Sequence, residues 1–349
     1  MQRLLFFAGA YYYPPFDEGV KLVAYHLYQH LSRLTEVVLA TTAEGAPEEA
    51  NVVPNNPFGF ARHVRRLCKA HRPEAVLYVP DAYLDRYTLA RCGLLRWAAG
   101  GVPTGMVTLM PATVDMWVRV MTRFLRPDVV FPVTDWELDF YRRRGIRYRM
   151  FPPAIDVERF RPARDEAEKR ALRRKYSLPE EGKICIHVGH FRRSRNVDRL
   201  IRLQVPEGVH LVVVGRRSRP GEDDTAQTLR DHGAIILDSF LPDVQEVYQA
   251  ADLYLFPVEV DRAAIAMPLS VLEAMACNLP VVSTPYGGLV RCFEGVQGVY
   301  FARTREEFQE AMARALTGPV PRTREAMEGH SWGRAATDIL AGLEECRCR

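Results

Sequence analysis

One stretch, residues 249–288, constrains the fold of this chain more than any other part of its 349 residues. Residues 252–256 form a short apolar run that Pro257 ends, which is typical of a buried parallel strand. After a loop, an apolar face at helical spacing follows, and residues 281–283 begin a second apolar run. This order of strand, helix and strand predicts part of a parallel sheet that a helix crosses.

The helix in this stretch has signals at both ends. Pro268 and Ser270 mark its start, and Ser270 with Glu273 has the S-x-x-E spacing of a capping box. Asn278 tolerates the left-handed turn that ends a helix, and Pro280 blocks its continuation. A helix that opens at the carboxyl end of a parallel strand presents free N–H groups and partial positive charge, so anions such as phosphates bind there.

Glu273 has two interpretations that its position leaves open. It either caps its own helix or accepts hydrogen bonds from the hydroxyl groups of a ligand at the helix start. The spacing by itself favours the cap.

The same alternation of apolar runs and amphipathic segments extends along the chain. Further strands are expected at residues 3–8, 37–40, 75–79, 102–109, 129–133, 184–188, 210–214 and 234–237, and helices at 20–34, 60–71, 135–145, 164–176, 196–203, 243–250 and 324–345. Residues 41–59 are expected to form a surface loop. Since 349 residues fit two domains, the sequence predicts an α/β protein with two doubly wound halves that face each other across a cleft.

Composition and charge exclude several classes of protein. With 48% hydrophobic and 26% charged residues the chain is not disordered, and its net charge of +4 is far below that of a nucleic-acid-binding protein. The seven cysteines lack zinc-ligand spacing, and the N-terminal apolar run is too short to span a membrane. We therefore expect a cytoplasmic protein that binds no nucleic acid.

Two pairs of side chains have some metal-binding character. His26 and His30 are four residues apart in an expected helix, and Cys346 and Cys348 lie in the tail. Neither pair has further ligands nearby, so the histidines fit partly buried helix positions better. Because no acidic D-x-D cluster is present, we expect that no metal or other cofactor is required.

The 249–288 stretch resembles the donor site of the retaining glycosyltransferases of family 4, the group 1 family, whose GT-B fold has two Rossmann-like domains. The matching segments are EAMA at residues 273–276, PVV at 280–282 and the pair Gly287-Gly288. The start of the chain is also similar to that family, since Tyr13-Pro14-Pro15 and then Gly19 precede a helix. The resemblance implies that Gly19 lets the backbone approach the donor phosphate or the acceptor.

The resemblance also implies a domain organisation. Residues 151–162, FPPAIDVERFRP, match the family's linker, and His330-Ser331-Trp332 match the start of its last helix. We therefore expect an acceptor-side domain at residues 1–155 and a nucleotide-sugar domain at 156–330. The helix at 331–349 is expected to pack back on the first domain.

Family members hold the ribose of the donor with a helix glutamate, which assigns that role to Glu273. When their G-R-x-x-x-x-K-G motif is aligned on Gly189, His190 stands at the first basic position of the motif and Arg195 at the position of its lysine. Arg195 is therefore expected to hold the diphosphate. Arg195 and Glu273 are the expected catalytic residues. The expected donor site as a whole comprises Gly19, Gly189, His190, Arg192, Arg193, Arg195, Ile265, Pro268, Leu269, Ser270, Glu273, Gly287 and Gly288.

The sequence departs from the family pattern at the reaction centre. The first glutamate of the family is replaced by Ile265, and Met110-Pro111 stand where a histidine often follows the strand. A second interpretation therefore stays open, in which a catalytically degenerate GT-B homologue binds a nucleotide sugar or a partner enzyme without turnover. A third, an epimerase, would need acid–base side chains that the sequence does not place.

The resemblance implies transfer of a sugar from a donor such as a UDP- or GDP-sugar to a glycan, a lipid-linked molecule or a small molecule, with retention at the anomeric carbon. The expected helix at 60–71 carries Arg62, Arg65, Arg66 and Lys69. A charge run of this kind is usually a solvated face. The resemblance also leaves open a peripheral contact of this helix with the inner face of the membrane.

Overall fold

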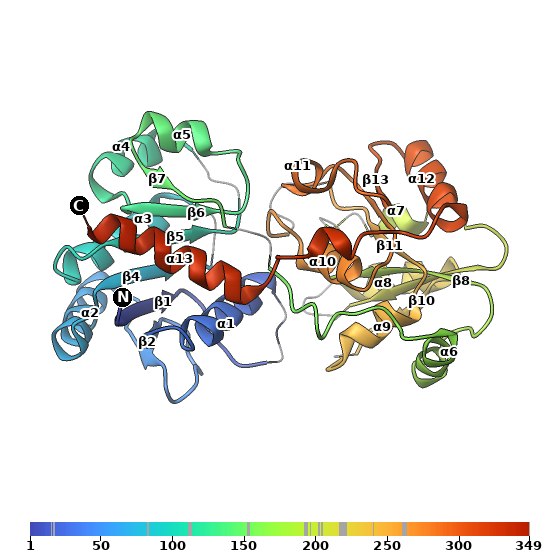
Figure 1. Ribbon diagram of the computed structural model, residues 1–349, viewed down its shortest axis with the longest axis horizontal. Helices are drawn as coiled ribbons and strands as arrows, with labels where there is room; N and C mark the ends of the chain where they lie inside the picture. The colour runs from blue at the N-terminus through green and yellow to red at the C-terminus, as the bar shows by residue number, and fades with distance from the viewer. Residues whose placement is uncertain are drawn as a thin grey trace. The chain divides into compact units, whose positions relative to one another are not determined.

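The computed structural model describes residues 1–14, 16, 18–81, 84–110, 114–151, 154–191, 195, 197–201, 203, 205–215, 222–239, 241–259 and 264–348. The chain divides into two compact units. Unit 1 comprises Met1–Pro153, Ile265–Met267 and Trp332–Arg349, and unit 2 comprises Ala154–Ala264 and Pro268–Ser331 (Figure 1).

Unit 1 contains a seven-stranded parallel sheet in the order β3-β2-β1-β4-β5-β6-β7. Its strands are β1 (Arg3–Ala8), β2 (Glu36–Thr41), β3 (Asn51–Val52), β4 (Ala75–Val79), β5 (Thr104–Thr108), β6 (Val129–Pro132) and β7 (Arg147–Tyr148). In β1, five of the six side chains are buried, because helices cover both faces of the sheet. The strand order reverses between β1 and β4.

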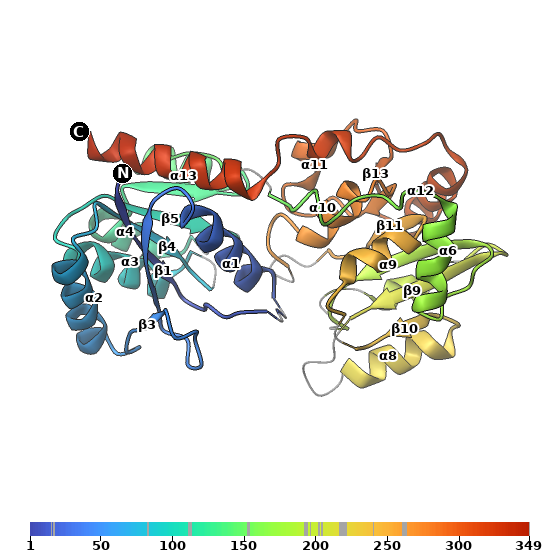
Figure 2. The same cartoon turned by 60° about the horizontal axis from the view of Figure 1, so that its bottom comes forward.

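Helices lie on both faces of this sheet (Figures 1 and 2). One face carries α1 (Gly19–Leu31) and α13 (Trp332–Arg347), and the other carries α2 (Pro57–His71), α3 (Arg86–Ala98), α4 (Met116–Leu125) and α5 (Leu138–Arg143). Successive strand residues point to opposite faces. Phe7 therefore packs with the α2 side of the core, whereas Phe6 meets Tyr28 of α1 at a ring distance of 6.1 Å.

Unit 2 contains a six-stranded sheet in the order β10-β9-β8-β11-β12-β13. All of its neighbouring strands are parallel: β8 (Lys183–Val188), β9 (Val209–Val214), β10 (Ile235–Leu237), β11 (Leu253–Phe256), β12 (Val281–Ser283) and β13 (Val299–Phe301). Its helices are α6 (Glu166–Lys175), α7 (Asp198–Ile201), α8 (Glu222–Asp231), α9 (Val244–Ala250), α10 (Leu269–Ala276), α11 (Leu289–Phe293) and α12 (Arg305–Thr317). The strand order reverses between β8 and β11. Two parallel, doubly wound sheets of this kind confirm the predicted α/β class.

A buried carboxylate ties α6 to the unit 2 sheet. Asp252, directly before β11, accepts hydrogen bonds from Lys169 and Arg173 of α6, both at 2.7 Å, and from the Ile184 N–H of β8 at 2.7 Å. Burial opposes its charge, but the hydrogen bond and the charge of Lys169 prevail and hold the pKa of Asp252 below its usual value. The ion pairs of Asp252 therefore stabilise the packing of α6 against the unit 2 sheet.

The sequence predicted several elements within one or two residues. The strands at 3–8, 75–79 and 281–283 are confirmed as β1, β4 and β12. The left-handed turn at Asn278 is also confirmed, with φ 57°. The patterns gave no signal for α3, α4, α8, α11 and α12, nor for the strands β3, β7 and β13.

Three expected boundaries were wrong. Helix α2 begins at Pro57 and not at residue 60, because the Asn56 side chain caps the Gly59 N–H at 2.8 Å and proline suits the first helical position. The loop expected at 41–59 contains β3. The tail is not one helix: a 3₁₀ turn at Glu325–Met327 precedes Gly329, whose φ of 79° stops it, and α13 follows.

The segment Ile265–Met267 was expected in the second domain but belongs to unit 1. The Ala266 N–H donates to the Leu109 carbonyl, directly after β5, at 2.8 Å. A backbone hydrogen bond of this kind joins the segment to the unit 1 sheet.

Candidate functional site

The strongest candidate site lies in unit 2, where the carboxyl ends of β8 and β11 are adjacent. In open α/β sheets, ligands bind outside the carboxyl ends of the strands at the point where the strand order reverses. Gly189 follows β8, and Gly215 follows β9. A Cβ on Gly215 would clash with the Gly189 carbonyl oxygen, so only glycine fits there and the two turns approach closely.

Arg195 reaches this point of the sheet. Its Nη1 atom lies 3.6 Å from the position that a Cβ on Gly189 would take, so the guanidinium lies beside the turn after β8. Its side chain is half-buried, and His190 is buried. The structure therefore brings Gly189 and Arg195 together as the sequence expected, whereas Arg192 and Arg193 lie outside the described residues.

His187 lies under the same turn and is neutral. Its Nδ1 donates to the Leu255 carbonyl at 2.8 Å, and its buried Nε2 has no hydrogen-bond partner within the described residues. Burial lowers the pKa of His187 to about 4, and the nearby charge of Arg195 acts in the same direction. At neutral pH Arg195 therefore supplies the positive charge at this turn, and His187 does not.

Helix α10 follows β11 and opens at the same edge of the sheet. The prediction that Ser270 and Glu273 form a capping box is wrong, since Pro268 is the N-cap residue and makes no side-chain capping hydrogen bond. Because the helix begins at Leu269, Glu273 is the fifth helical residue and lies too far along to reach the N-cap N–H. Ser270 instead hydrogen-bonds the Tyr254 hydroxyl of β11.

Glu273 is a buried carboxylate with a defined partner. Its Oε2 accepts a hydrogen bond from the Tyr248 hydroxyl of α9 at 2.7 Å. Burial raises the pKa of Glu273 to about 7, although the Tyr248 hydrogen bond and the charge of Arg159 act in the opposite direction. A carboxylate can accept about four hydrogen bonds, so a single hydroxyl leaves capacity for a ligand.

Two tyrosines that the sequence did not single out organise this site. The rings of Tyr248 and Tyr254 lie 5.8 Å apart, and the Tyr254 ring stacks on His187 at 6.3 Å. The charges of Glu273 and Arg195 both act on the Tyr254 hydroxyl, whose pKa is raised, chiefly by burial. Tyrosines within apolar runs are ordinary core residues, so the sequence gave no signal for them.

The glycine pair forms the expected turn. Gly287 has φ 57°, a left-handed conformation that favours glycine, and Gly288 precedes α11 as its N-cap residue. The Tyr286 hydroxyl donates to the Ala264 carbonyl at 2.7 Å and accepts from the Ala264 N–H at 3.0 Å. This pair of bonds fixes the end of the loop before α10 against the glycine turn.

Gly19 and Ile265 lie together in unit 1. Gly19 is the first residue of α1, and a Cβ there would lie 3.2 Å from Cδ1 of Ile265. Ile265 is buried, so this position presents a packed apolar side chain where the resembled family has a carboxylate.

His26 and His30, which were considered as metal ligands, pack as ordinary helix residues. His26 stacks on Trp332 of α13 with ring centroids 4.9 Å apart, and the ring of His30 hydrogen-bonds the His26 carbonyl at 2.9 Å. Within the described ranges, no three His, Cys, Asp or Glu side chains are grouped as they would be around a metal ion.

Comparison with known proteins finds a family model that matches the part of unit 2 that holds this site. Residues 182–318, which hold all six strands of the unit 2 sheet, match the model of a family described as Glycosyl transferases group 1. Over these residues unit 2 is similar to the group 1 glycosyltransferases. The candidate site at β8, β11 and α10 lies wholly within the matched residues.

Curated relatives are similar over part of their length. The D-inositol 3-phosphate glycosyltransferase of Actinosynnema mirum is 29% identical over 245 residues, 61% of this chain and 56% of that protein. The mannosylfructose-phosphate synthase of Agrobacterium fabrum is 27% identical over 198 residues, 50% of this chain and 41% of that protein. The chain thus spans about half the length of these relatives.

Solved structures share the fold of this chain. Sucrose-phosphate synthase from Thermosynechococcus elongatus superimposes with a TM-score of 0.76 at 17% identity, covering 99% of both chains. Anabaena HepE in complex with UDP-glucose superimposes with a TM-score of 0.74 at 15% identity, covering 99% of this chain and 100% of that chain. These likenesses and the two sheets show the predicted two-domain GT-B fold.

Proposed function

We propose that this protein is a retaining, metal-independent glycosyltransferase that uses a nucleoside-diphosphate sugar. The observation that carries the proposal is that a cation and a carboxylate lie at the same edge of the unit 2 sheet. The cation of Arg195 lies beside the turn after β8, and the carboxylate of Glu273 lies in α10, with Tyr254 near both. A nucleoside-diphosphate sugar presents two matching groups, a dianionic diphosphate and ribose hydroxyls.

The diphosphate is assigned to Arg195 and the start of α10. A guanidinium binds phosphate oxygens with two parallel hydrogen bonds and keeps its charge at any physiological pH. The first N–H groups of an α-helix have no partner within the helix, and in α10 these belong to Leu269 and Ser270. Both groups stabilise the charge that develops on the diphosphate as it leaves.

The ribose is assigned to Glu273. In its ionised form the carboxylate accepts hydrogen bonds from two ribose hydroxyls in addition to that from Tyr248. The match of residues 182–318 to the group 1 glycosyltransferases and the UDP-glucose bound by Anabaena HepE support a sugar nucleotide as donor. UDP- and GDP-sugars are the first candidates.

The transfer is proposed to proceed with retention. The bond from the anomeric carbon to the phosphate oxygen breaks, and the acceptor hydroxyl forms its bond on the same face of the sugar. Its proton passes to the leaving phosphate oxygen, so the protein needs no nucleophile or base of its own. The acceptor class proposed is a glycan, a lipid-linked molecule or a small molecule with a free hydroxyl.

The test is nucleotide release from a panel of UDP-, GDP- and ADP-sugars by the purified protein, with and without EDTA. Slow hydrolysis of one donor that EDTA does not affect is the expected result. Calorimetry on the same donors separates the alternatives. Binding without release would favour a protein that holds a nucleotide sugar without turnover, and no binding of any donor would refute the proposal.

A further inference from the structure

Three helices of unit 1 share an unusual surface composition. Helices α2, α3 and α4 pack side by side on one face of the sheet, with α3 in the middle (Figure 2). Together they contain nine Lys and Arg residues and no Asp or Glu, although the whole chain has a net charge of only +4. We refer to the outer surface of α2, α3 and α4 as the basic face.

Most of these charges have no ion-pair partner among the described residues. Arg96 pairs with Asp128 at 2.9 Å, and Arg91 donates to Asn55 at 2.6 Å. The exposed side chains Arg62, Arg66, Lys69, Arg119 and Arg123 have no carboxylate within ion-pair distance among the described residues. Like charges that repel each other in this way cost stability unless an anionic partner covers them.

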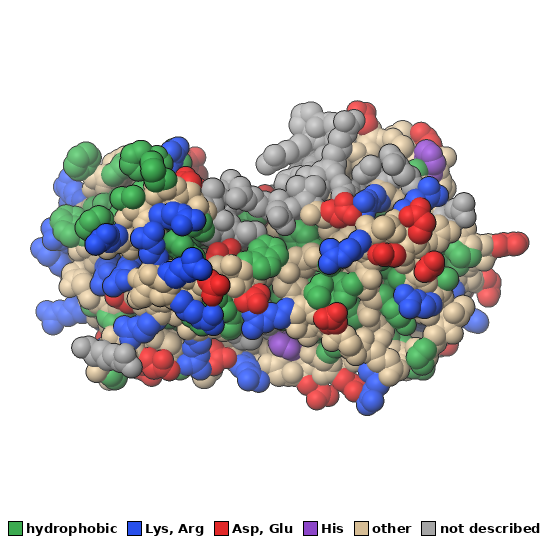
Figure 3. Space-filling model, turned by 90° about the horizontal axis from the view of Figure 1, so that it is seen from above, with side chains coloured by type: hydrophobic (Ala, Val, Ile, Leu, Met, Phe, Trp, Pro, Cys, Tyr) green, Lys and Arg blue, Asp and Glu red, His purple; other side chains and the backbone are tan. Residues whose placement is uncertain are grey.

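Large apolar side chains lie among these charges. Phe58 is 90% exposed, Trp97 59%, Trp117 56% and Phe124 75%. In Figure 3, hydrophobic side chains gather beside Lys and Arg side chains over the unit on the left. A single exposed aromatic residue is ordinary, but several on three adjacent helices indicate a binding surface.

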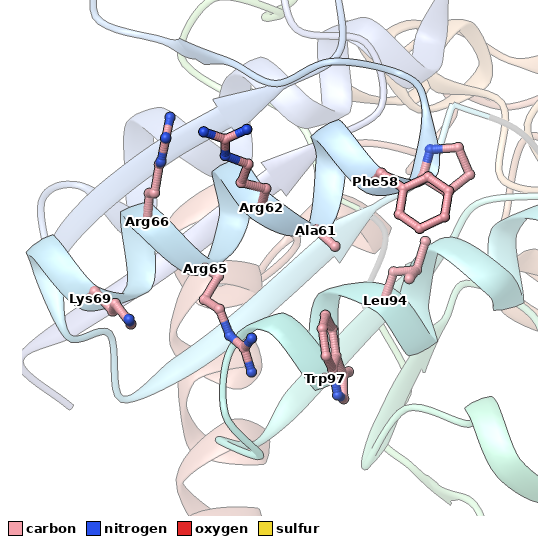
Figure 4. Close-up of a pocket in the computed structure, with 9 residues that line it drawn as sticks. Phe58, Ala61, Arg62, Arg65, Arg66, Lys69, Leu94 and Trp97 are labelled. Atoms are coloured by element: carbon pink, nitrogen blue, oxygen red, sulfur yellow. The ribbon is translucent and has the colours of Figure 1, made fainter.

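A groove between α2 and α3 combines both kinds of side chain. It has a volume of about 620 Å³ and is lined by Phe58, Arg62, Arg65, Lys69, Leu94 and Trp97. Figure 4 shows Arg65 directed towards Trp97, and the guanidinium carbon lies 4.5 Å from the centre of the indole ring. A stacked guanidinium keeps its N–H groups available for a phosphate while its apolar face is covered.

We propose that the basic face docks on an anionic lipid bilayer. Arginine and lysine bind lipid phosphates, and tryptophan and phenylalanine insert at the level of the headgroups, which is the composition that interfacial helices use. The core of a protein interface is depleted in charge, and a nucleic-acid surface does not require exposed aromatic residues on three helices. No helix in the described part of the chain is long and apolar enough to cross a membrane. The contact is therefore a surface attachment.

The test is sedimentation of the full chain with vesicles of equal parts phosphatidylcholine and phosphatidylglycerol, and with vesicles of phosphatidylcholine alone. Each basic residue near an anionic surface strengthens binding by about fivefold. Arg62→Gln/Arg66→Gln/Lys69→Gln is therefore expected to weaken binding to the anionic vesicles by about 100-fold. The matched control removes three exposed arginines of unit 2, Arg170→Gln/Arg303→Gln/Arg305→Gln, and should bind nearly as well as the parent.

A second pair of variants tests the apolar part of the face. Phe58→Ser/Phe124→Ser should lower vesicle binding at high salt, where charge attraction is screened, while Val320→Ser in unit 2, 77% exposed in the parent, should not. Equal binding of parent and both basic-face variants, equal binding to neutral vesicles, or dimerisation through this face in light scattering would overturn the proposal. Preference for DNA over anionic vesicles would overturn it too. Donor hydrolysis without an added acceptor should be unchanged in all these variants. Failure of the membrane proposal can therefore be distinguished from failure of the proposed glycosyl transfer.

Discussion

Tyr248 provides the sharpest test of the proposed donor site, because its hydroxyl donates a hydrogen bond to Glu273. The two oxygens lie 2.7 Å apart, and burial raises the pKa of Glu273 to about 7. If only the ionised carboxylate binds ribose, affinity for the nucleotide sugar should rise about tenfold between pH 6 and pH 8. Tyr248→Phe removes the hydroxyl while keeping the ring.

The size of the effect follows from the lost hydrogen bond. A hydrogen bond to a charged group is worth about 1.5–3 kcal/mol, which raises the pKa of Glu273 by about 1–2 units when it is lost. At pH 7 the affinity of Tyr248→Phe for the donor should therefore fall about five- to fiftyfold. It should recover as the pH is raised further, which a disrupted site would not do.

The assay is calorimetric titration with UDP- and GDP-glucose, because the diphosphate of a sugar nucleotide does not titrate in this range. Tyr141→Phe, a buried tyrosine of unit 1, is the matched control and should leave the affinity unchanged. Glu273→Gln should weaken binding and abolish its pH dependence. A pH dependence that persists in Glu273→Gln, or an affinity of Tyr248→Phe equal to that of the parent at every pH, would refute the reasoning.

The same pKa predicts how stability depends on pH. The folded protein holds a proton on Glu273 that the unfolded chain releases above its usual pKa of 4.5, because burial raises the folded value to about 7. The free energy of unfolding of the apo protein should thus decrease as the pH rises from about 4.5 to 7, by about 3 kcal/mol from this group. Glu273→Gln should remove this decrease in melting experiments.

Three further predictions concern other residues. Arg195→Ala should lower turnover about tenfold or more with little change in melting temperature, since a charge-assisted contact is worth about 1.5–3 kcal/mol. Unchanged turnover on an identified donor would contradict the assignment of Arg195 to the diphosphate. Ile265→Glu should shift the preference among donor sugars, because it places a carboxylate where the parent has a packed apolar side chain, and identical relative rates across a donor panel would contradict this. Asp252→Asn should destabilise unit 2 by about 3 kcal/mol, because Arg173 and Lys169 lose their counter-charge. Since the pKa of Asp252 is lowered in the folded protein, the parent should lose the stability that Asp252 contributes as the pH falls below the usual aspartate range. Denaturant titrations of the parent and of Asp252→Asn at neutral and acidic pH would measure the difference.

The sequence by itself determined the class of fold and several elements around the proposed donor site. A parallel strand buried on both faces must be a short, unbroken apolar run, so β1, β4 and β12 could be predicted to the residue. The turn at Gly287 and the left-handed Asn278 are equally local, because the backbone conformation at each depends on the residue itself.

Tertiary structure decided how the site residues act. Tyr248 is 25 residues before Glu273 in the chain, and only the packing of α9 against α10 brings the hydroxyl to the carboxylate. The capping box at Ser270 and Glu273 had the right spacing, but the helix begins at Leu269 and so neither residue caps it. The exposure of Trp117 and Phe124 on α4 also has no sequence signal, because an apolar side chain on a short helix is buried or exposed according to what packs against it. Burial and long-range pairing depend on the whole fold, which a local pattern does not contain.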